Sequence, residues 1–275
     1  MILNIDNYFI TKYTVINFIG KGDMIIKKRI MICLAAVLTV VFAISVLTAC
    51  SLKGDDNKGD DNANVEKELN ASECSSELNG AIAASTAKDN YSIKVTGSAG
   101  EGRSSVVNIE YDSDTHHVTV SSTQDYLGVT TNIYTETYLF VRGGKYYIST
   151  RASENASFSA PGELGSKAEF DKVAAGYLLN SIIGKFTLNG TAEVTYTGKK
   201  KGTDSSIEVT TVAEVNGVQT ELYTSYTIKN GLVTSVFQRV SEYDASNVPT
   251  IMTENTVTVR YDIGAVELAA GIQVE

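Results

Sequence analysis

The residue types that most often do chemistry in proteins are sparse in this sequence. His116 and His117 are its two histidines, and they are adjacent in the chain. Neighbouring residues of a β-strand point to opposite faces, so we do not expect these two to hold one metal ion or to serve one catalytic site. Asp112 and Asp114 come just before them. We therefore interpret the whole segment as the polar tip of a hairpin.

Other catalytic patterns are equally weak. The sequence contains no HExxH and no GxSxG motif. A glycosidase needs two carboxyl groups close together, and nothing in the sequence brings together Glu136 and Glu221, which lie in predicted strands. Gly97, Gly100 and Gly102 lie between two predicted strands, so they lack the helix N-terminus that would bind a phosphate. We expect no enzymatic activity, no metal site and no cofactor.

The three cysteines occupy different positions. Cys33 lies inside an uncharged apolar run, Cys50 directly follows that run, and Cys74 stands in the part predicted to fold. One cysteine alone cannot form an intramolecular disulfide. No histidine is near Cys74 in the sequence, so we interpret it as a partly buried, unreactive residue.

The N-terminal part has the layout of a secretory signal. A basic patch, residues 27–29, precedes 20 uncharged residues, 30–49. The run ends in Leu47-Thr48-Ala49-Cys50, which resembles the lipobox of bacterial lipoproteins. The resemblance implies cleavage before Cys50 and a diacylglyceryl group on its sulfur. The membrane would then be a partner through the anchor at Cys50, and the domain would lie outside the cytoplasmic membrane or on another envelope membrane.

Two alternatives bear on this N-terminal part. Twenty residues are just long enough to span a hydrocarbon core of about 30 Å, so a permanent transmembrane anchor is the other interpretation. Residues 1–23 fit a signal poorly, and a start at Met24 would leave 24–49 as an ordinary lipoprotein signal peptide. The first 23 residues would then be a mis-annotated extension.

Charge and length limit the function classes. Residues 50–275 carry a net charge of −12, since the first 49 residues hold five Lys/Arg and two Asp/Glu out of a chain total of −9. Nucleic-acid binding needs a basic surface, which argues against that class of partner. Residues 50–64 contain a single large apolar residue, so we expect a disordered acidic tether. Asp55-Asp56-Asn57 within it lacks the glycine and glutamate register of a calcium loop. Residues 65–275 are expected to form one domain.

Helices are predicted in two parts of that domain. Apolar residues recur at helical spacing after Val65, which predicts one or two helical segments, the stronger from about 75 to 87. A second helix, roughly 168–183, begins at a capping box made by Ser166 and Glu169 and ends at Gly184. Its apolar stripe is expected to lie on a sheet.

The remainder alternates between apolar and polar residues, as expected of strands with one buried face. Residues 131–141 place apolar side chains on both faces, which predicts a sheet covered on both sides there. Asn216-Gly217, Asn230-Gly231 and Gly143-Gly144 are hairpin turns. The fold class is therefore α+β, mainly β. We expect a strongly curved antiparallel sheet of about ten strands, a half-barrel covered by the N-terminal helix and the central amphipathic helix.

This layout resembles the LolA/LppX-like superfamily of bacterial lipid-handling proteins. The resemblance lies in the lipobox and tether, a helix leading directly into a first strand (residues 78–97), the segment Gly-Lys-Tyr-Tyr-Ile (144–148), an internal helix and long hairpins. It implies a concave apolar face, roofed by helices, that encloses a cavity for acyl chains. The residues that would line such a cavity are Ile109, Tyr111, Leu139, Tyr177, Leu222, Tyr226, Val236 and Tyr261. For each of them separately, ordinary core packing is the alternative.

Three functional interpretations stay open. The first is a non-catalytic envelope lipoprotein that binds or carries a lipid or other apolar ligand. The second is a structural or sensory surface lipoprotein with a packed core that binds a partner protein. The third is an enzyme with an unrecognised carboxylate site.

Overall fold

The computed structural model describes residues 65–274, apart from 100, 101, 127, 128, 185, 187, 189–191, 216, 245 and 247. The upstream extension, the signal peptide, Cys50 and the tether therefore lie outside the described residues, as do Gly100 and Asn216. Among the described residues, no helix combines the length and the apolar character needed to cross a bilayer.

The described chain forms one sheet of twelve strands, all paired antiparallel, in the order β1-β8-β9-β10-β11-β12-β2-β3-β4-β5-β6-β7. The strands are β1 (Lys67–Leu69), β2 (Asn90–Ala99), β3 (Arg103–Asp112), β4 (Thr115–Tyr126), β5 (Val129–Arg142), β6 (Lys145–Arg151), β7 (Gly162–Leu164), β8 (Ala192–Lys201), β9 (Asp204–Val215), β10 (Val218–Lys229), β11 (Leu232–Tyr243) and β12 (Pro249–Tyr261). The sheet is not closed, because β1 and β7 are its two edges.

The fold class predicted from the sequence, α+β and mainly β, is confirmed at this level. The two strands beyond the expected ten are the edge strands β1 and β7, each of three residues. Three residues are too few to show alternation, so the sequence pattern did not reveal them.

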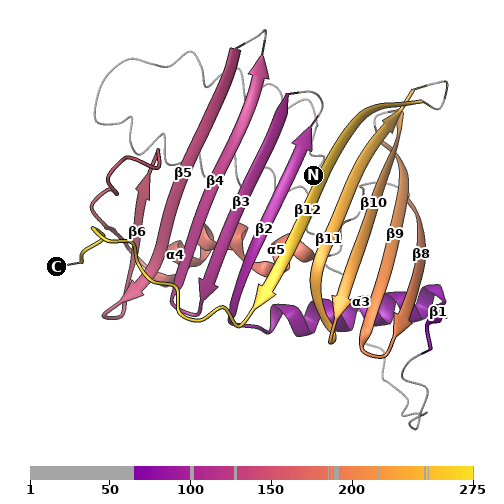
Figure 1. Cartoon of the computed structure of the whole chain (residues 1–275), viewed down its shortest axis with the longest axis horizontal. Helices are drawn as coiled ribbons and strands as arrows, with labels where there is room; N and C mark the ends of the chain where they lie inside the picture. The colour runs from indigo at the N-terminus through magenta and orange to yellow at the C-terminus, as the bar shows by residue number, and fades with distance from the viewer. Residues whose placement is uncertain are drawn as a thin grey trace. The chain divides into compact units, whose positions relative to one another are not determined.

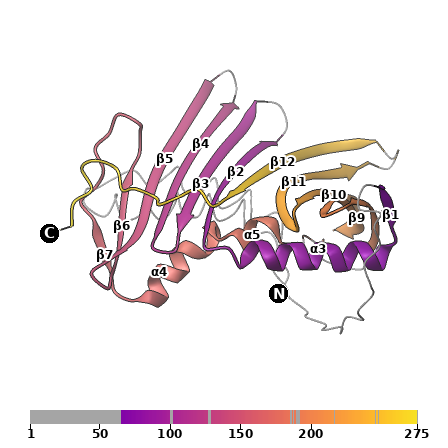
Figure 2. The same cartoon turned by 60° about the horizontal axis from the view of Figure 1, so that its bottom comes forward.

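The N-terminal helix, α3 (Ala71–Thr86), begins four residues before the expected position. Its start is a complete capping box, in which the Asn70 side chain accepts a hydrogen bond from Glu73 N at 3.0 Å. The Glu73 carboxylate accepts one from Asn70 N at 2.9 Å. Asn-x-x-Glu is a readable start signal that the spacing of apolar residues alone did not locate. The helix packs on β8 and β11, and it runs beneath one end of the strands (Figures 1 and 2).

The central helix predicted over 168–183 is wrong as a single element. It consists of α4 (Lys167–Ala174), the 3₁₀ turn η1 (Ala175–Tyr177) and α5 (Leu179–Ile183). Leu178 between them is extended, with φ −73° and ψ 142°. The Tyr91 hydroxyl accepts a hydrogen bond from Leu179 N at 3.1 Å. The sheet thus supplies a partner for an amide that a continuous helix would have paired internally.

Of the two predicted caps of this helical segment, the capping box at its start is present in part and the glycine at its end is confirmed. The Ser166 side chain accepts a hydrogen bond from Glu169 N, but the Glu169 carboxylate accepts one from Gly165 N and not from Ser166 N. Gly184 is the C-cap residue of α5, as predicted. A Cβ atom there would lie 2.7 Å from the carbonyl oxygen of Asn180, so only glycine fits this close approach.

Residues 131–141 belong to β5, and their predicted burial from both sides is confirmed over 136–140. On one side, Tyr138, Phe140 and Tyr147 pack with Ile272 of the C-terminal segment. This segment crosses β5 and β6 on the side away from α4 (Figure 2). Two predicted hairpin turns are also confirmed, because Asn230, Gly231, Gly143 and Gly144 all have positive φ.

Cys74 is fully buried at the contact between α3 and β8. Burial raises the pKa of its thiol, which fits the predicted unreactive residue. A Cβ atom at Gly198 of β8 would lie 2.8 Å from Cys74 Sγ and 3.0 Å from the carbonyl oxygen of Ser206. Gly198 therefore lets the helix approach the sheet at this point.

We expect Gly198→Ala to destabilise the fold by about 1–3 kcal/mol, because the added methyl collides with Cys74 Sγ. In the double variant Cys74→Ala, Gly198→Ala, this collision is absent. Its loss of stability should be smaller than the sum of the two single losses by about 1 kcal/mol, measured by urea unfolding. Strictly additive losses would show that the helix does not rest on Gly198.

Candidate functional site

The strand residues predicted to line a ligand cavity all lie on one face of the sheet. The cross-strand registers assign them to the face that carries Tyr91 and Tyr226. Both of these tyrosines contact the helices. Tyr91 accepts the hydrogen bond from Leu179 N, and the Tyr226 hydroxyl donates to the carbonyl oxygen of Gly184 at 3.0 Å. We call this side the helix face and the opposite side the outer face.

At the helix-covered end, the predicted lining residues are packed. Six of the eight expose 3% of their surface or less: Ile109, Leu139, Tyr177, Leu222, Tyr226 and Val236. Tyr111 and Tyr261 are half-buried. They do not form one cluster, because β10 and β5 lie six strand positions apart in the sheet. At about 4.8 Å per strand, Leu222 and Leu139 are roughly 29 Å apart along the sheet.

Further along β2, β3 and β4, the helix face is not fully covered. Val95, Val107 and Val120 are cross-strand neighbours, and all three are half-buried. Ile133 and Val129 on β5 share this face and expose 48% and 65% of their surface. We call the five aligned residues Val236, Val257, Val95, Val107 and Val120 the valine row. Apart from Val236, these residues were not singled out from the sequence, although the same alternation marks them.

The outer face of β3–β6 carries a polar network centred on Glu136. The carboxylate accepts hydrogen bonds from the Tyr134 hydroxyl and from Arg151 Nε, each at 2.7 Å. His117 Nε2 lies 2.9 Å from the other oxygen, and His117 Nδ1 lies 2.8 Å from Glu110. Four adjacent strands are thereby linked by side chains.

Glu136 is 6% exposed, yet it stays ionised. Burial by itself would raise the pKa of this carboxyl. The hydrogen bonds from Tyr134, Arg151 and His117 outweigh burial and lower the pKa below its ordinary value. Burial together with the charges of Glu136 and Glu110 raises the pKa of Tyr138 to about 12. Every oxygen of the buried carboxylate is engaged, so the network is suited to holding strands together rather than to transferring a proton to a substrate.

The two histidines point to opposite faces, as predicted from their adjacency. They are not a polar hairpin tip, however, because His116 is 3% exposed and packs against Tyr111 and Phe170, with ring centroids 4.4 and 5.9 Å away. Burial lowers the pKa of His116 to about 4, and its Nδ1 has no hydrogen-bond partner within the described residues. The burial of His116 was not predicted, because the sequence does not indicate that α4 packs against β4. His117 stacks on Tyr138 at 4.3 Å.

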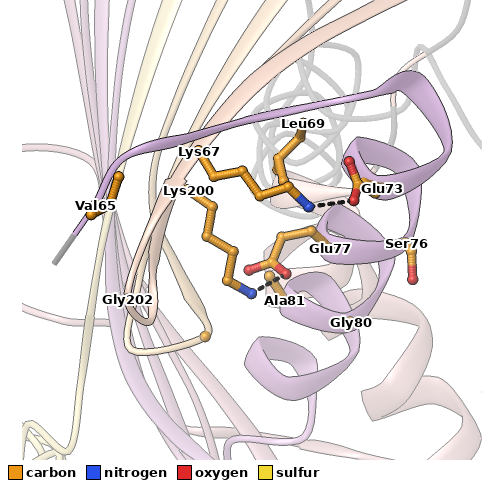
Figure 3. Close-up of a pocket in the computed structure, with 11 residues that line it drawn as sticks. Val65, Lys67, Leu69, Glu73, Ser76, Glu77, Gly80, Ala81, Lys200 and Gly202 are labelled. Atoms are coloured by element: carbon orange, nitrogen blue, oxygen red, sulfur yellow. Dashed lines mark hydrogen bonds and ion pairs between the residues drawn. The ribbon is translucent and has the colours of Figure 1, made fainter. Parts of the chain in front are cut away.

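A hollow of about 660 Å³ lies elsewhere, between β1, α3 and the turn after β8 (Figure 3). Its charged residues are paired: Lys67 Nζ lies 2.6 Å from Glu73, and Lys200 Nζ lies 2.6 Å from Glu77. The Ser205 hydroxyl also donates to Glu77 at 3.2 Å. The hollow contains none of the eight predicted lining residues.

No group of three or more His, Cys, Asp or Glu side chains within the described ranges is arranged to hold a metal ion. Glu136 and Glu221 are on strands six positions apart, so they do not form a carboxylate pair. No protein-family model matches the sequence, and no curated protein is significantly similar to it.

The buried His116 predicts a specific pH dependence of stability. Its pKa is lowered in the folded state, so the unfolded chain binds the additional proton and stability falls as the pH drops from about 6.5 towards about 4. When the pH is lowered from about 7.5 to about 5, protonation of His116 should lower the free energy of unfolding of the wild type by about 2 kcal/mol. The variant His116→Phe should not show this loss. Urea unfolding at both pH values measures the difference. Equal losses in both proteins would show that His116 protonates without cost in the fold.

Proposed function

We propose that this protein is a non-catalytic cell-envelope lipoprotein, tethered through Cys50, whose domain binds a lipid or another apolar ligand on the helix face. The observation that carries the proposal is the partly open valine row. Val95, Val107 and Val120 keep apolar surface accessible on this face. The outer-face residues adjacent to them along β2–β4 are polar apart from Val106: Lys94, Thr96, Val106, Asn108, Thr119 and Ser121. Accessible apolar surface on one side of a polar sheet is typical of a binding surface.

The proposal requires a curved sheet that is covered by helices at one end. Packing of α3 on β8 and β11 and the hydrogen bond between Tyr91 and Leu179 support it. A ligand would then lie beyond the helices, along Val95, Val107 and Val120, and not among the packed residues Leu139 and Val236.

A second candidate is a structural or sensory lipoprotein that binds a partner protein. The tight packing of the helix-covered end favours it, since Leu139 and Val236 expose no surface there. In that case the accessible valines would contact protein and not lipid.

Attachment through Cys50 is tested by metabolic labelling. The wild type should incorporate labelled palmitate and begin at Cys50, because two acyl chains are the stable form of such an anchor. Cys50→Ala should abolish the label, and the matched control Cys33→Ala should retain it. Cys74 cannot account for a remaining label, because its side chain is fully buried in the fold. A wild-type protein that is unlabelled and uncleaved would favour the transmembrane anchor.

Ligand binding is tested with two neighbouring residues of β4 that point to opposite faces. The protein is purified from cells, and co-purifying lipid is extracted and quantified by mass spectrometry. Val120→Asp should reduce bound lipid at least about tenfold, because it places a charge under an apolar ligand. Ser121→Asp adds the same charge on the outer face and should leave the lipid content unchanged. Circular dichroism confirms that both variants are folded.

The outcome decides between the two candidates. A wild type that carries no lipid, or equal lipid in both variants, would contradict binding on the helix face and favour a protein partner.

A further inference from the structure

A line of five uncharged polar residues and one glycine crosses the helix face next to the valine row. Each residue is the direct cross-strand neighbour of the next, over six consecutive strands from β10 to β4. The residues, here called the amide–hydroxyl row, are Thr224, Gln238, Asn255, Gly97, Ser105 and Ser122. Each lies two positions along its strand from the neighbouring apolar row, which consists of Tyr226 and the five valines. All members of the row but Thr224 are half-buried. Polar groups that are partly removed from water on an otherwise apolar face need hydrogen-bond partners.

Gly97 gives the row its continuity. A Cβ atom there would lie 2.5 Å from Asn255 Oδ1 and 3.1 Å from the Ser105 hydroxyl oxygen. The Asn255 amide therefore lies over the backbone of β2 and points towards β3. A side chain at position 97 would push this amide away, so the glycine leaves amide and hydroxyl groups side by side.

One member of the row lacks a partner. Gln238 Nε2 is buried and makes no hydrogen bond within the described part of the chain. A buried amide that has lost water and gained no partner destabilises the fold. A ligand with a hydrogen-bond acceptor at this position would satisfy it.

Charge narrows the class of ligand. Neither the amide–hydroxyl row nor the valine row contains a charged residue. Arg103 is a cation on this face, two residues along β3 from Ser105, and residues 50–275 as a whole are strongly acidic. An anionic head group placed on the row would therefore lack a counter-charge, whereas an acyl chain there would leave the polar groups unpaired.

We infer that the ligand is an amphiphile with an uncharged head group that carries hydroxyl or amide groups. Its alkyl part lies along the half-buried members of the valine row, Val95, Val107 and Val120, and its head group hydrogen-bonds to the adjacent amide–hydroxyl row. The inference rests on the proposed function and specifies which apolar ligands the helix face accepts.

The experiment uses the full chain in membranes of the cells that produce it. Two photoreactive probes share a dodecyl chain with a diazirine and differ only in the head group, an uncharged maltoside or an anionic sulfate. After irradiation, the yield of cross-linked protein is measured, and the cross-linked peptides are identified by mass spectrometry. The wild type should favour the maltoside probe by at least about fivefold, which corresponds to one or two neutral hydrogen bonds. The cross-links should lie on β2, β3 and β4, which carry the half-buried valines.

Two variants remove the row without removing the valines. Asn255→Val and Gln238→Leu should each abolish the preference for the maltoside head group while cross-linking through the alkyl chain persists. Gln238→Leu should also leave the melting temperature unchanged or higher, because it deletes the unpaired amide. Asn108→Val on the outer face of β3 is the matched control and should keep the preference.

The experiment distinguishes failure of the proposed function from failure of the inference about the head group. Specific labelling by neither probe would overturn the proposed function together with this inference. Equal labelling by both probes would overturn the inference alone. So would a preference for the sulfate probe that disappears in Arg103→Gln, or a maltoside preference that survives both row variants.

Discussion

The antiparallel register across the sheet decides which side chains share a face. Each cross-strand pair places two side chains on the same face, so the alternation is carried across the sheet from β8 to β6. The register shifts at Thr227/Ile228 in the β10–β11 pair and at Glu242/Tyr243 in the β11–β12 pair, outside both rows. A slip of one residue in any strand would move its valines to the outer face and its charges under the helices. Both the valine row and the amide–hydroxyl row exist because the strands from β10 to β4 keep this register.

The two faces use the register for different purposes. On the outer face, the linked side chains of Glu110, His117, Glu136 and Arg151 cross four strands and give a buried carboxylate all of its partners. On the helix face, apolar residues are packed solidly where the helices cover them and stay half-buried where the helices end. Binding is proposed at the boundary between these regions, where apolar surface and polar groups are adjacent and incompletely satisfied.

A break in the central helical segment lets both of its pieces contact the sheet. Leu178 is extended, so α4 and α5 lie along the sheet in two short pieces, one against His116 through Phe170 and the other against Tyr91. Glycines at two contacts, Gly184 and Gly198, allow the chain to approach more closely than a Cβ atom would permit. The side chains of the helix face are thus buried at one end of the strands and half-buried further along them.

Alternation and turn residues are local signals, so the fold class, most of the strands, the two-sided burial of β5 and the opposite orientation of the two histidines could be predicted from them. The sequence also located the cysteines and the acidic balance. It did not determine the break at Leu178, the burial of His116 or the partners of Glu136, because each depends on residues distant in the chain. Tyr91 meets Leu179 across 88 positions, and only pairing of β12 with β2 aligns Asn255 with Gly97. Which polar residues form a row depends on the register between strands that are distant in the chain, and this register is a property of the assembled sheet.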